Sequence, residues 1–413
     1  MNVLHVSPYY SPARGFGGPL ASMEALVAGL TAAGVKNKVL TSDRAGPEGG
    51  HLAGDLINKE GDVRYCRWMA ESVPVLRNWY PCADFGKLLN SALLWADVAH
   101  LHGLWTYPVA AAARGCRRAG VPYVVSPRGS LMGPARRTRQ WKKLPYYWFV
   151  ERRNLAGAGV IHAASAAERS ALDPLGVPVA LVPNGVDAPE LRECDVRAGA
   201  GEKMERHRQG RGAIGFLGRL HPIKGVDMML EIANRLERVA PGVTVHFAGP
   251  REDTASTEAV MRAAASSHGR LAYAGELTGG EKWSFLNKLS LLVVPSLQES
   301  FGMAGAEALA CGVPVVLTPE VGLSEFVAGC AAARIVPREA GALSGSIVEL
   351  LENVNGYEAA ALDARRLFES QFAMRSVVAA FVNLYQGLKT RAESTARTGS
   401  NNEASHPRSP VSG

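Results

Sequence analysis

The sequence predicts an α/β protein of two domains, each built on a parallel β-sheet. Short apolar runs that suit buried strands alternate with segments of helical periodicity, which is the pattern of parallel sheets covered by helices. This alternation occurs twice, once on each side of a polar stretch at 188–211 that contains no predicted strand. A length of 413 residues agrees with two domains, because a single hydrophobic core seldom extends over so long a chain.

The first half begins with a strand, a Gly-rich loop, a helix and a second strand. Its strands are expected at 3–7, 38–42, 98–102, 123–126 and 159–163. Helices are expected between strands at 20–33 and 110–119. The segment 44–69 combines Gly-rich loops with a pattern that favours an edge hairpin, and nothing finer is predicted there.

The second half repeats this order after the polar stretch. Its strands are expected at 213–217, 243–248, 291–294 and 313–317. Its helices are expected at 226–239, 302–310, 344–353, 357–370 and 374–389. The first domain is therefore predicted to span 1–185 and the second 186–373. From 390 to 413 Ser, Thr, Asn, Arg and Pro dominate, so this tail is expected to be disordered.

Two glutamates near the start of one predicted helix form the most informative motif. Glu299 falls in the loop after the strand at 291–294, and Glu307 falls more than one turn into the helix, among small and apolar residues. A carboxylate with few polar neighbours needs a partner, and sugar hydroxyls would serve. The free backbone N–H groups near 302–304 would form an anion site for a diphosphate. The alternative is two solvated glutamates, since charged side chains are mostly exposed.

A basic loop opens the second half. Arg219 and Lys224 lie in Gly218-Arg-Leu-His-Pro-Ile-Lys-Gly225, between the first strand and the first helix of that half. Arg supplies a fork of donors and Lys a point charge, so the pair suits a diphosphate. Solvated loop bases are the ordinary interpretation, but the glutamate motif further along the same sheet favours phosphate binding.

Two further candidates follow strands of the first half. Gly17 and Gly18 come after the first strand and would let the backbone approach a ligand closely, although a tight turn is the commoner reason for a Gly pair. His102 ends the strand at 98–102, where a histidine is either a ligand-binding group or a satisfied core residue. Both positions lie at the carboxyl edge of a parallel sheet, where such sheets bind ligands.

Basic residues concentrate in one segment of a chain whose formal net charge is +7. Between 114 and 153 the only acid is Glu151, and aromatic residues interleave with the bases, above all over 136–153. Anionic lipid surfaces attract such segments while the rings insert shallowly. The alternative is that the aromatic rings pack on the core and the bases are solvated. Nucleic acid is not an expected partner, because no nucleic-acid motif accompanies the bases.

Composition and spacing disfavour several classes of protein. No apolar run reaches the roughly 18 to 20 residues that span a bilayer, and the N-terminus lacks the pattern of a secretory signal, so the cytoplasm is the expected compartment. The six cysteines have no regular spacing, which predicts reduced thiols and no metal site. An oxidoreductase is disfavoured, since neither half carries Gly-x-Gly-x-x-Gly after its first strand.

Taken together, these motifs resemble those of the retaining glycosyltransferases called group 1, or glycosyltransferase family 4. The resemblance rests on the Glu-x7-Glu segment of Glu299 and Glu307, the Gly-Arg-Leu-x-x-x-Lys-Gly loop, Pro183-Asn-Gly-Val-Asp187, and the positions of Gly17, Gly18 and His102. It extends to about Lys389. One departure is Gly34-Val35, where the family usually carries Gly-His.

The resemblance implies a GT-B architecture, in which two Rossmann-like domains face a cleft. The first domain would bind the acceptor, the second the nucleotide-sugar donor, and the helix at 374–389 would return to the first domain. The resemblance also implies roles for single residues. Arg219 and Lys224 would neutralise the donor diphosphate, and Glu307 would hold the ribose hydroxyls. Glu299 would contact the transferred sugar and His102 would orient it. Further donor contacts are expected at Gly17, Gly18, Phe301, Gly302, Met303 and Ala304. Arg128 is a candidate for contact with the acceptor or a phosphate.

The predicted reaction is transfer of a hexose, with retention, from a nucleotide-diphosphate sugar to a glycan or lipid-linked acceptor, as in assembly of a surface polysaccharide. No metal or other cofactor is expected, because two cations and a helix N-terminus would stabilise the departing diphosphate. A nucleotide-sugar 2-epimerase on the same architecture is the alternative. A non-catalytic sugar-binding protein would not need both glutamates and the cationic loop.

Overall fold

The computed structural model describes residues 1–13, 18–54, 61–71, 73, 76–132 and 144–403. The chain divides into two compact units. The first unit contains Met1–Ala163, Glu168–Val182 and Val378–Gly413, and the second contains Ala164–Ala167 and Pro183–Val377. The division at Val182 and Pro183 lies beside the expected boundary at 185, and the last division falls inside the final helix.

The first unit is built on a parallel sheet with strand order β5-β2-β1-β6-β7-β8-β9. The strands are β1 Asn2–Val6, β2 Lys36–Ser42, β5 Val63–Cys66, β6 Val98–His102, β7 Tyr123–Ser126, β8 Val160–Ala163 and β9 Val179–Leu181. The hairpin predicted within 44–69 is the antiparallel pair β3 Arg44–Gly46 and β4 Gly49–His51.

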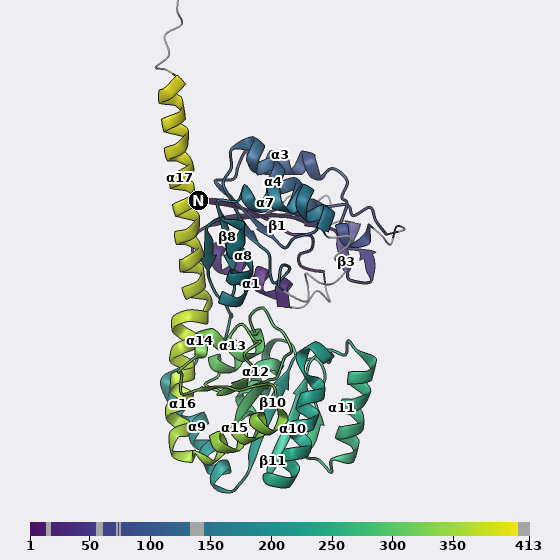
Figure 1. The fold of residues 1–413 in the computed structure, drawn as a ribbon, viewed down its shortest axis with the longest axis vertical. Helices are drawn as coiled ribbons and strands as arrows, with labels where there is room; N and C mark the ends of the chain where they lie inside the picture. The colour runs from purple at the N-terminus through teal and green to yellow at the C-terminus, as the bar shows by residue number, and fades with distance from the viewer. Residues whose placement is uncertain (14–17, 55–60, 72, 74–75, 133–143, 404–413) are drawn as a thin grey trace, which may run out of the picture. The chain divides into compact units, whose positions relative to one another are not determined.

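Helices cover both faces of this sheet (Figure 1). Residues of α3 and α4 pack with Leu4 and Val6 of β1 in one core, while α1 packs with Val39 of β2 in another. Because successive strand residues point to opposite faces, His5 lies on the face away from Leu4 and Val6. The helical segments are α1 Gly18–Ala32, η1 Arg77–Trp79, α3 Phe85–Leu93, α4 Tyr107–Ala119, η2 Tyr147–Glu151, α7 Arg152–Ala156, α8 Ala166–Leu172 and η3 Asp173–Leu175.

The second unit repeats this architecture on a parallel sheet with strand order β12-β11-β10-β13-β14-β15. The strands are β10 Gly212–Leu217, β11 Val243–Ala248, β12 Leu271–Tyr273, β13 Leu291–Val294, β14 Val315–Leu317 and β15 Ala333–Ile335. The helical segments are α9 Glu193–Arg208, η4 Pro222–Lys224, α10 Val226–Val239, α11 Thr254–Ser266, α12 Gly279–Lys288, α13 Met303–Ala310, α14 Ser324–Val327, α15 Ala340–Glu352, α16 Val354–Leu367 and η5 Phe368–Phe372. Two α/β units with parallel sheets confirm the predicted fold class.

The polar stretch 188–211 is not a linker. Most of it forms α9, which belongs to the second unit and packs against α16. Its buried apolar residues Val196 and Ala200 are four positions apart and form a cluster with Tyr357 and Ala361. One narrow apolar stripe therefore suffices to dock a helix that is otherwise polar.

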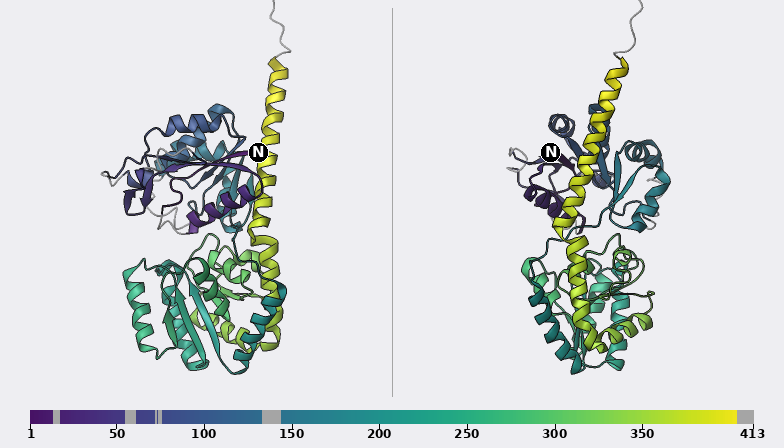
Figure 2. Two further views of the ribbon diagram at one scale, coloured as in Figure 1. Left: turned by 180° about the vertical axis from the view of Figure 1, so that it is seen from behind. Right: turned by 90° about the vertical axis from the view of Figure 1, so that its left-hand side faces the viewer.

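The last helix, α17, spans Met374–Glu403 and continues from the second unit into the first. Its part that belongs to the first unit lies beside that unit's sheet in every view (Figures 1 and 2), and the Lys389 Nζ atom is 3.0 Å from Asp97 Oδ1. Residues 390–403 are helical, which differs from the expected disordered tail; this segment has no Gly or Pro before Gly399 to interrupt the helix. Residues 404–413 lie outside the described chain. None of the helices in the described ranges combines the length and apolar character needed to cross a membrane.

Candidate active site

Two predicted site residues of the second unit meet directly. The Lys224 Nζ atom, at the end of η4, lies 2.7 Å from Glu299 Oε1. The Ser296 hydroxyl donates to the other oxygen of Glu299 at 3.1 Å. The side chains of Lys224 and Glu299 are 19% and 17% exposed, so the pair is partly desolvated and still open to a ligand.

Backbone contacts hold the two loops that carry this pair. The Leu297 N–H donates to the Ile223 carbonyl at 2.9 Å. Gly225, with φ of +79°, lies so close to the loop after β13 that a Cβ atom would be 2.1 Å from the Pro295 carbonyl oxygen. Glycine is therefore required both for the left-handed backbone and for the close approach.

Glu307 has a partner that the sequence did not indicate. Its Oε1 atom is 2.7 Å from Nζ of Lys282, which lies on α12. Burial raises the pKa of the Glu307 carboxyl group, and the lysine acts in the opposite direction. The prediction that this carboxylate needs a partner agrees with the contact, but no spacing rule links residues 282 and 307, so the sequence offered no signal for Lys282.

The N-terminus of α13 follows Glu299 closely in the chain. Gly302 caps this helix with φ of 111°, and a Cβ atom there would be 2.7 Å from Val321. The N–H groups of Met303 and Ala304 are the first two of the helix, so they have no partner within it. Phe301 is buried and packs edge-on against Phe326 and Phe372, which anchors the loop.

Arg219 is not part of this cluster. Its guanidinium pairs with the Glu252 carboxylate, and both side chains are more than two-fifths exposed. Of the two cations predicted for the diphosphate, Lys224 therefore contacts Glu299, whereas Arg219 is held by another acid.

In the first unit, His102 at the end of β6 belongs to a hydrogen-bonded chain of side chains. Arg128 Nη2 donates to His102 Nδ1 at 3.1 Å, because a guanidinium can only donate. His102 must then carry its proton on Nε2, which lies 3.1 Å from Nδ1 of His5. His5 in turn donates from Nε2 to Asn37 Oδ1 at 3.2 Å. Both ring nitrogens of His102 are occupied, so it has no free lone pair with which to accept a proton.

A second chain runs beside the first. His162 Nε2 donates to the Val182 carbonyl at 2.8 Å, so its Nδ1 accepts from the Ser126 hydroxyl at 2.7 Å. Ser126 therefore accepts from His100 Nε2 at 2.6 Å. The remaining nitrogen of His100 accepts from the Tyr385 hydroxyl of α17, also at 2.6 Å. Donor and acceptor counting thus assigns one neutral tautomer to each histidine.

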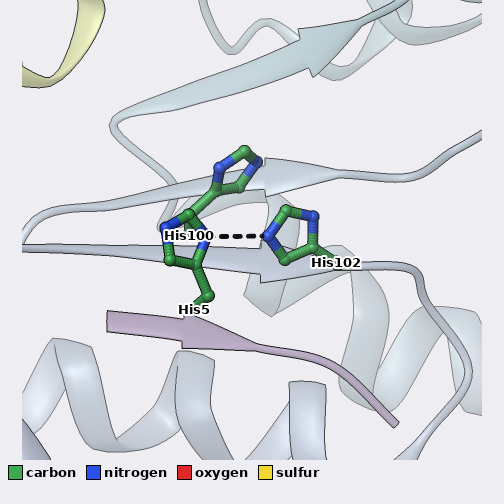
Figure 3. Close-up of side chains that lie close together, drawn as sticks. All are labelled: His5, His100 and His102. Carbon is green, nitrogen blue, oxygen red and sulfur yellow. Dashed lines mark hydrogen bonds between the residues drawn. The ribbon is translucent and has the colours of Figure 1, made fainter. Parts of the chain in front are cut away.

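Three of these histidines, His5, His100 and His102, have ring nitrogens within 4.8 Å of one another, as a metal site would (Figure 3). A metal ion needs one free lone pair from each ring. Those lone pairs accept hydrogen bonds from His102, Tyr385 and Arg128 respectively. The donor set in this arrangement therefore does not fit an ion, and the expected independence from metals stays a prediction.

Besides His102, the predicted site residues of the first unit are Gly17, Gly18 and Arg128. Gly17 lies outside the described residues, and Gly18 is the first residue of α1. Arg128 follows β7 and contacts His102, as described above.

Comparisons with known proteins agree with this arrangement of two units. A family model described as "Glycosyl transferase 4-like domain" matches residues 17–185, and one described as "Glycosyl transferases group 1" matches residues 211–353. Among solved structures, a sucrose-phosphate synthase from Thermosynechococcus elongatus has a TM-score of 0.69 at 18% identity, over 94% of this chain and 99% of that one. Anabaena HepE in complex with UDP and glucose has a TM-score of 0.67 at 16% identity, over 94% and 100%.

Sequence relatives match over shorter stretches. A glycogen synthase from Mycobacterium tuberculosis is 28% identical over 218 residues, which are 51% of this chain and 49% of that protein. A D-inositol 3-phosphate glycosyltransferase from Segniliparus rotundus is 32% identical over 41% of this chain and 37% of that protein. The matches thus span about half or less of these relatives.

The two parallel-sheet units and their structural neighbours define a protein of the GT-B fold. The two family models, which together cover most of both units, narrow the classification from fold to family. The chain belongs to the group 1, or family 4, glycosyltransferases.

Proposed function

We propose that the protein transfers a sugar from a nucleoside diphosphate sugar to an acceptor hydroxyl, with retention of the anomeric configuration. The observation that carries this proposal is the Lys224–Glu299 pair just before the N-terminus of α13. Lys224 and the free N–H groups of α13 suit an anionic diphosphate, whereas Glu299 and Glu307 suit hydroxyl groups. A nucleotide sugar carries both kinds of group, so one such ligand satisfies the whole set.

The charges at this site fit the departure of a diphosphate. Breaking the bond between the anomeric carbon and the phosphate oxygen leaves negative charge on that oxygen and positive character on the sugar ring. Lys224 and the positive end of α13 would stabilise the departing group. Glu299 would bind hydroxyls of the transferred sugar, and Glu307, held by Lys282, would bind the ribose hydroxyls.

Retention follows from attack on the same face as departure. The acceptor oxygen forms a bond to the anomeric carbon while the bond to the phosphate oxygen breaks, and the acceptor proton passes to that phosphate oxygen. No protein base is needed in this scheme. This agrees with His102, whose two ring nitrogens are both engaged in hydrogen bonds and whose pKa is well below 6.5 because of burial. With both nitrogens engaged, His102 would orient the sugar through contact with its ring and would not take up a proton.

The donor is proposed to be a nucleotide hexose. Anabaena HepE, which shares the fold, was solved with UDP and with UDP-glucose. The test is a thermal-shift comparison of UDP, GDP and ADP, followed by incubation of the stabilising nucleotide's sugar conjugates with candidate acceptors. Transfer that needs an acceptor and keeps the anomeric configuration is expected. Inversion would refute retention, and conversion of the sugar without any acceptor would refute transfer.

The acceptor is proposed to be a glycan or a lipid-linked saccharide at an anionic membrane surface. Trp148 and Phe149 on η2 are 54% and 77% exposed, and Arg152 lies 4.9 Å from the centre of the Trp148 ring. Tyr147, in contrast, packs against the first core, so only part of the aromatic segment is buried. The bases at 136–143 lie outside the described residues. Exposed rings beside cations are the combination that binds lipid interfaces.

A further inference from the structure

A small pocket lies at the carboxyl edge of the first unit's sheet. Its volume is about 140 Å³, and its lining includes His102, Thr106, Arg128, Tyr9, Tyr80 and Ser130. No acidic side chain is among the residues described as lining it. The wall therefore combines apolar side chains with several hydrogen-bond donors and carries no negative charge from the residues described.

Thr106 is an unusual member of this wall. It is the N-cap residue of α4, where a threonine hydroxyl ordinarily accepts from an N–H of the first helical turn. Here the side chain makes no such bond, and its Oγ1 atom is buried without a hydrogen-bond partner. Only 7% of the residue is exposed. Burial of a hydroxyl group without a hydrogen-bond partner destabilises a protein. The unused hydrogen-bonding capacity of Thr106 therefore indicates a ligand that forms a hydrogen bond in the pocket.

Arg128 brings a positive charge to the same pocket. Its guanidinium donates to Ser22 Oγ at 2.7 Å and to His102 Nδ1 at 3.1 Å, both of which are neutral, and its Nε is buried without a partner. Burial lowers the pKa of this guanidinium. The nearby acid Glu168 accepts from the backbone N–H of Gly129, and no described carboxylate is within ion-pair distance of Arg128. The guanidinium is thus half-buried and forms no ion pair with a carboxylate of the described residues, although Glu168 lies near enough to favour its charge.

The backbone around the pocket is held in an uncommon conformation. Arg128 has φ of 52° and Tyr80 has φ of 56°, in the left-handed region that residues other than glycine seldom adopt. Such outliers persist where the surrounding structure imposes them, and they concentrate at ligand sites. The start of α4 adds the positive end of a helix dipole to the same wall.

We propose that this pocket binds an oxyanion, a carboxylate or phosphate group, carried by the acceptor. The inference rests on the proposed function, since it describes the acceptor of that reaction. An oxyanion would accept from Arg128 and from the Thr106 hydroxyl and would supply the missing counter-charge. The pocket is smaller than the roughly 300–1,000 Å³ of sites that enclose whole small molecules. It would therefore take one charged group of a larger acceptor.

The experiment uses the full chain saturated with UDP, so that the donor site is blocked. Inorganic phosphate and glucuronate are titrated calorimetrically into the wild type and into Arg128→Gln, Thr106→Val and Arg67→Gln. Arg67 is an exposed arginine of the same unit, and its substitution removes the same charge away from the pocket. The Arg128→Gln variant is expected to bind phosphate at least about tenfold more weakly, as loss of a charged hydrogen bond implies. Thr106→Val is expected to weaken binding several-fold, and Arg67→Gln to leave it unchanged. Arg128→Lys, which keeps the charge but loses the fork, is expected to restore part of the affinity.

Three results would overturn the inference. The first is failure of both probes to bind the UDP-loaded wild type, and the second is unchanged phosphate affinity in a folded Arg128→Gln variant. The third is an equal loss of affinity for UDP in Arg128→Gln, which would assign the guanidinium to the donor diphosphate. Failure of UDP, GDP and ADP alike to bind the wild type, with phosphate still bound through Arg128, would instead refute the nucleotide-sugar proposal and support the pocket.

Discussion

Each glutamate of the Glu-x7-Glu motif is neutralised by a lysine. Lys224 contacts Glu299 and Lys282 contacts Glu307, both at 2.7 Å. In the proposed reaction, a diphosphate that binds Lys224 would compete with Glu299, which would become free to bind sugar hydroxyls. One anion replaces another, so the partly buried ammonium group keeps a counter-charge throughout, which limits the cost of desolvation.

The first prediction concerns Lys224. The Lys224→Ala variant is expected to lower kcat by about 10²–10³-fold, as removal of one stabilising donor in the transition state typically does. The exposed Lys288→Ala variant, which loses the same charge from α12, is the matched control and is expected to keep full turnover. Initial rates with saturating donor measure both, and wild-type turnover in a folded Lys224→Ala variant would disprove the assignment.

The second prediction separates Glu307 from its lysine. Glu307→Gln is expected to weaken binding of the nucleoside diphosphate by about tenfold or more, because hydrogen bonds to a charged acceptor are lost. Lys282→Met removes the partner but leaves the carboxylate, so nucleotide affinity is expected to change less. Calorimetric titration of both variants and of their double mutant gives the coupling energy. Equal losses in the two single variants would show that the ion pair matters and that the carboxylate does not contact the nucleotide.

The two glutamates and Lys224 could be singled out from the sequence because each belongs to a short motif, one in the loop and helix after β13 and the other in the loop after β10. These two strands are neighbours in the sheet, which brings the two motifs together. The sequence did not predict Lys282, which reaches Glu307 from another helix, nor the pairing of Arg219 with Glu252. Contacts between side chains on separate elements depend on how those elements pack, and no spacing in the sequence records that.

The two histidine chains tie elements of the first unit together. They join β1, β6, β7 and β8, and through the Tyr385 hydroxyl they reach α17. In each chain every donor faces an acceptor, and an extra proton on His5 or His102 would place two donors face to face. An extra proton on His100 or His162 would require the hydroxyl of Tyr385 or Ser126 to give up the hydrogen bond that it donates. These chains therefore stabilise the unit only while the rings are neutral.

The third prediction follows from these neutral rings. Burial lowers the pKa of His5 and His162 to about 4, and lowers those of His100 and His102 well below 6.5. The unfolded chain binds protons near pH 6.5 and the folded chain does not, so stability is complete above that pH and falls as the pH drops toward 4. Each such histidine adds a slope of about 1.4 kcal/mol per pH unit to the free energy of unfolding. Urea unfolding at pH 7.5, 6 and 5 measures it.

A substitution makes the pH test specific. His162→Gln is expected to reduce the slope of the unfolding free energy against pH by the contribution of about one proton. His268→Asn, which changes an exposed histidine, is expected to leave this slope unchanged. A wild-type profile that stays flat between pH 7 and 5 would contradict buried neutral histidines.

The fourth prediction concerns the turn that presents Lys224. Gly225→Ala is expected to destabilise the protein and to lower turnover, because its Cβ would lie 2.1 Å from the Pro295 carbonyl oxygen and would push the two loops apart. Gly269→Ala is the matched control, since Gly269 also has positive φ but open space around its Cβ position. The control is expected to lose about 1–2 kcal/mol for backbone strain alone. Urea unfolding and initial rates compare the two, and equal effects would rule out the steric argument.

Long elements with a clear period were predictable, and short or polar ones were not. The strands at β10, β11 and β13 and the helix α10 fall close to their expected ranges. The three-residue strands β12 and β15 are too short to carry a period, and α9 is too polar to be distinguished from a linker. These elements form because neighbouring parts of the unit supply the packing that their own residues do not specify.

For the chain as a whole, the repeated strand–helix alternation was enough to predict two parallel-sheet units. The family was predicted from the resemblance of the loop motifs, and the family models bear it out. The histidine chains and the pocket of Arg128 were not predictable, because residues from four or more strands and helices build them. A parallel sheet brings such residues together by register, for example His5 opposite His100, and register is not visible in the spacing of the residues along the chain.

The net charge of +7 is a property of the whole protein, whereas the exposed rings of Trp148 and Phe149 lie at one place on it, in η2. Charge alone would attract the protein to anionic lipid only within about 10 Å at 0.1 M salt, and this attraction would weaken at higher ionic strength. Exposed Trp148 and Phe149 would add burial in the lipid interface, which salt does not screen. A surface that uses both should bind anionic vesicles at low salt and keep part of that binding when salt is raised.

The fifth prediction tests that combination. The protein is expected to co-sediment with vesicles of phosphatidylglycerol and phosphatidylcholine at low salt, and not with phosphatidylcholine alone. The double variant Trp148→Ser, Phe149→Ser is expected to bind at least about tenfold more weakly, since each ring contributes on the order of 1.5 kcal/mol or more when buried. Val239→Ser, which replaces an exposed apolar residue of the second unit, is the control and is expected to bind like the wild type. If the double variant also binds like the wild type, the rings do not enter the interface and attraction by charge is the whole effect. If the wild type does not sediment with anionic vesicles at low salt, the proposed membrane surface is wrong, and the acceptor must reach the enzyme from solution.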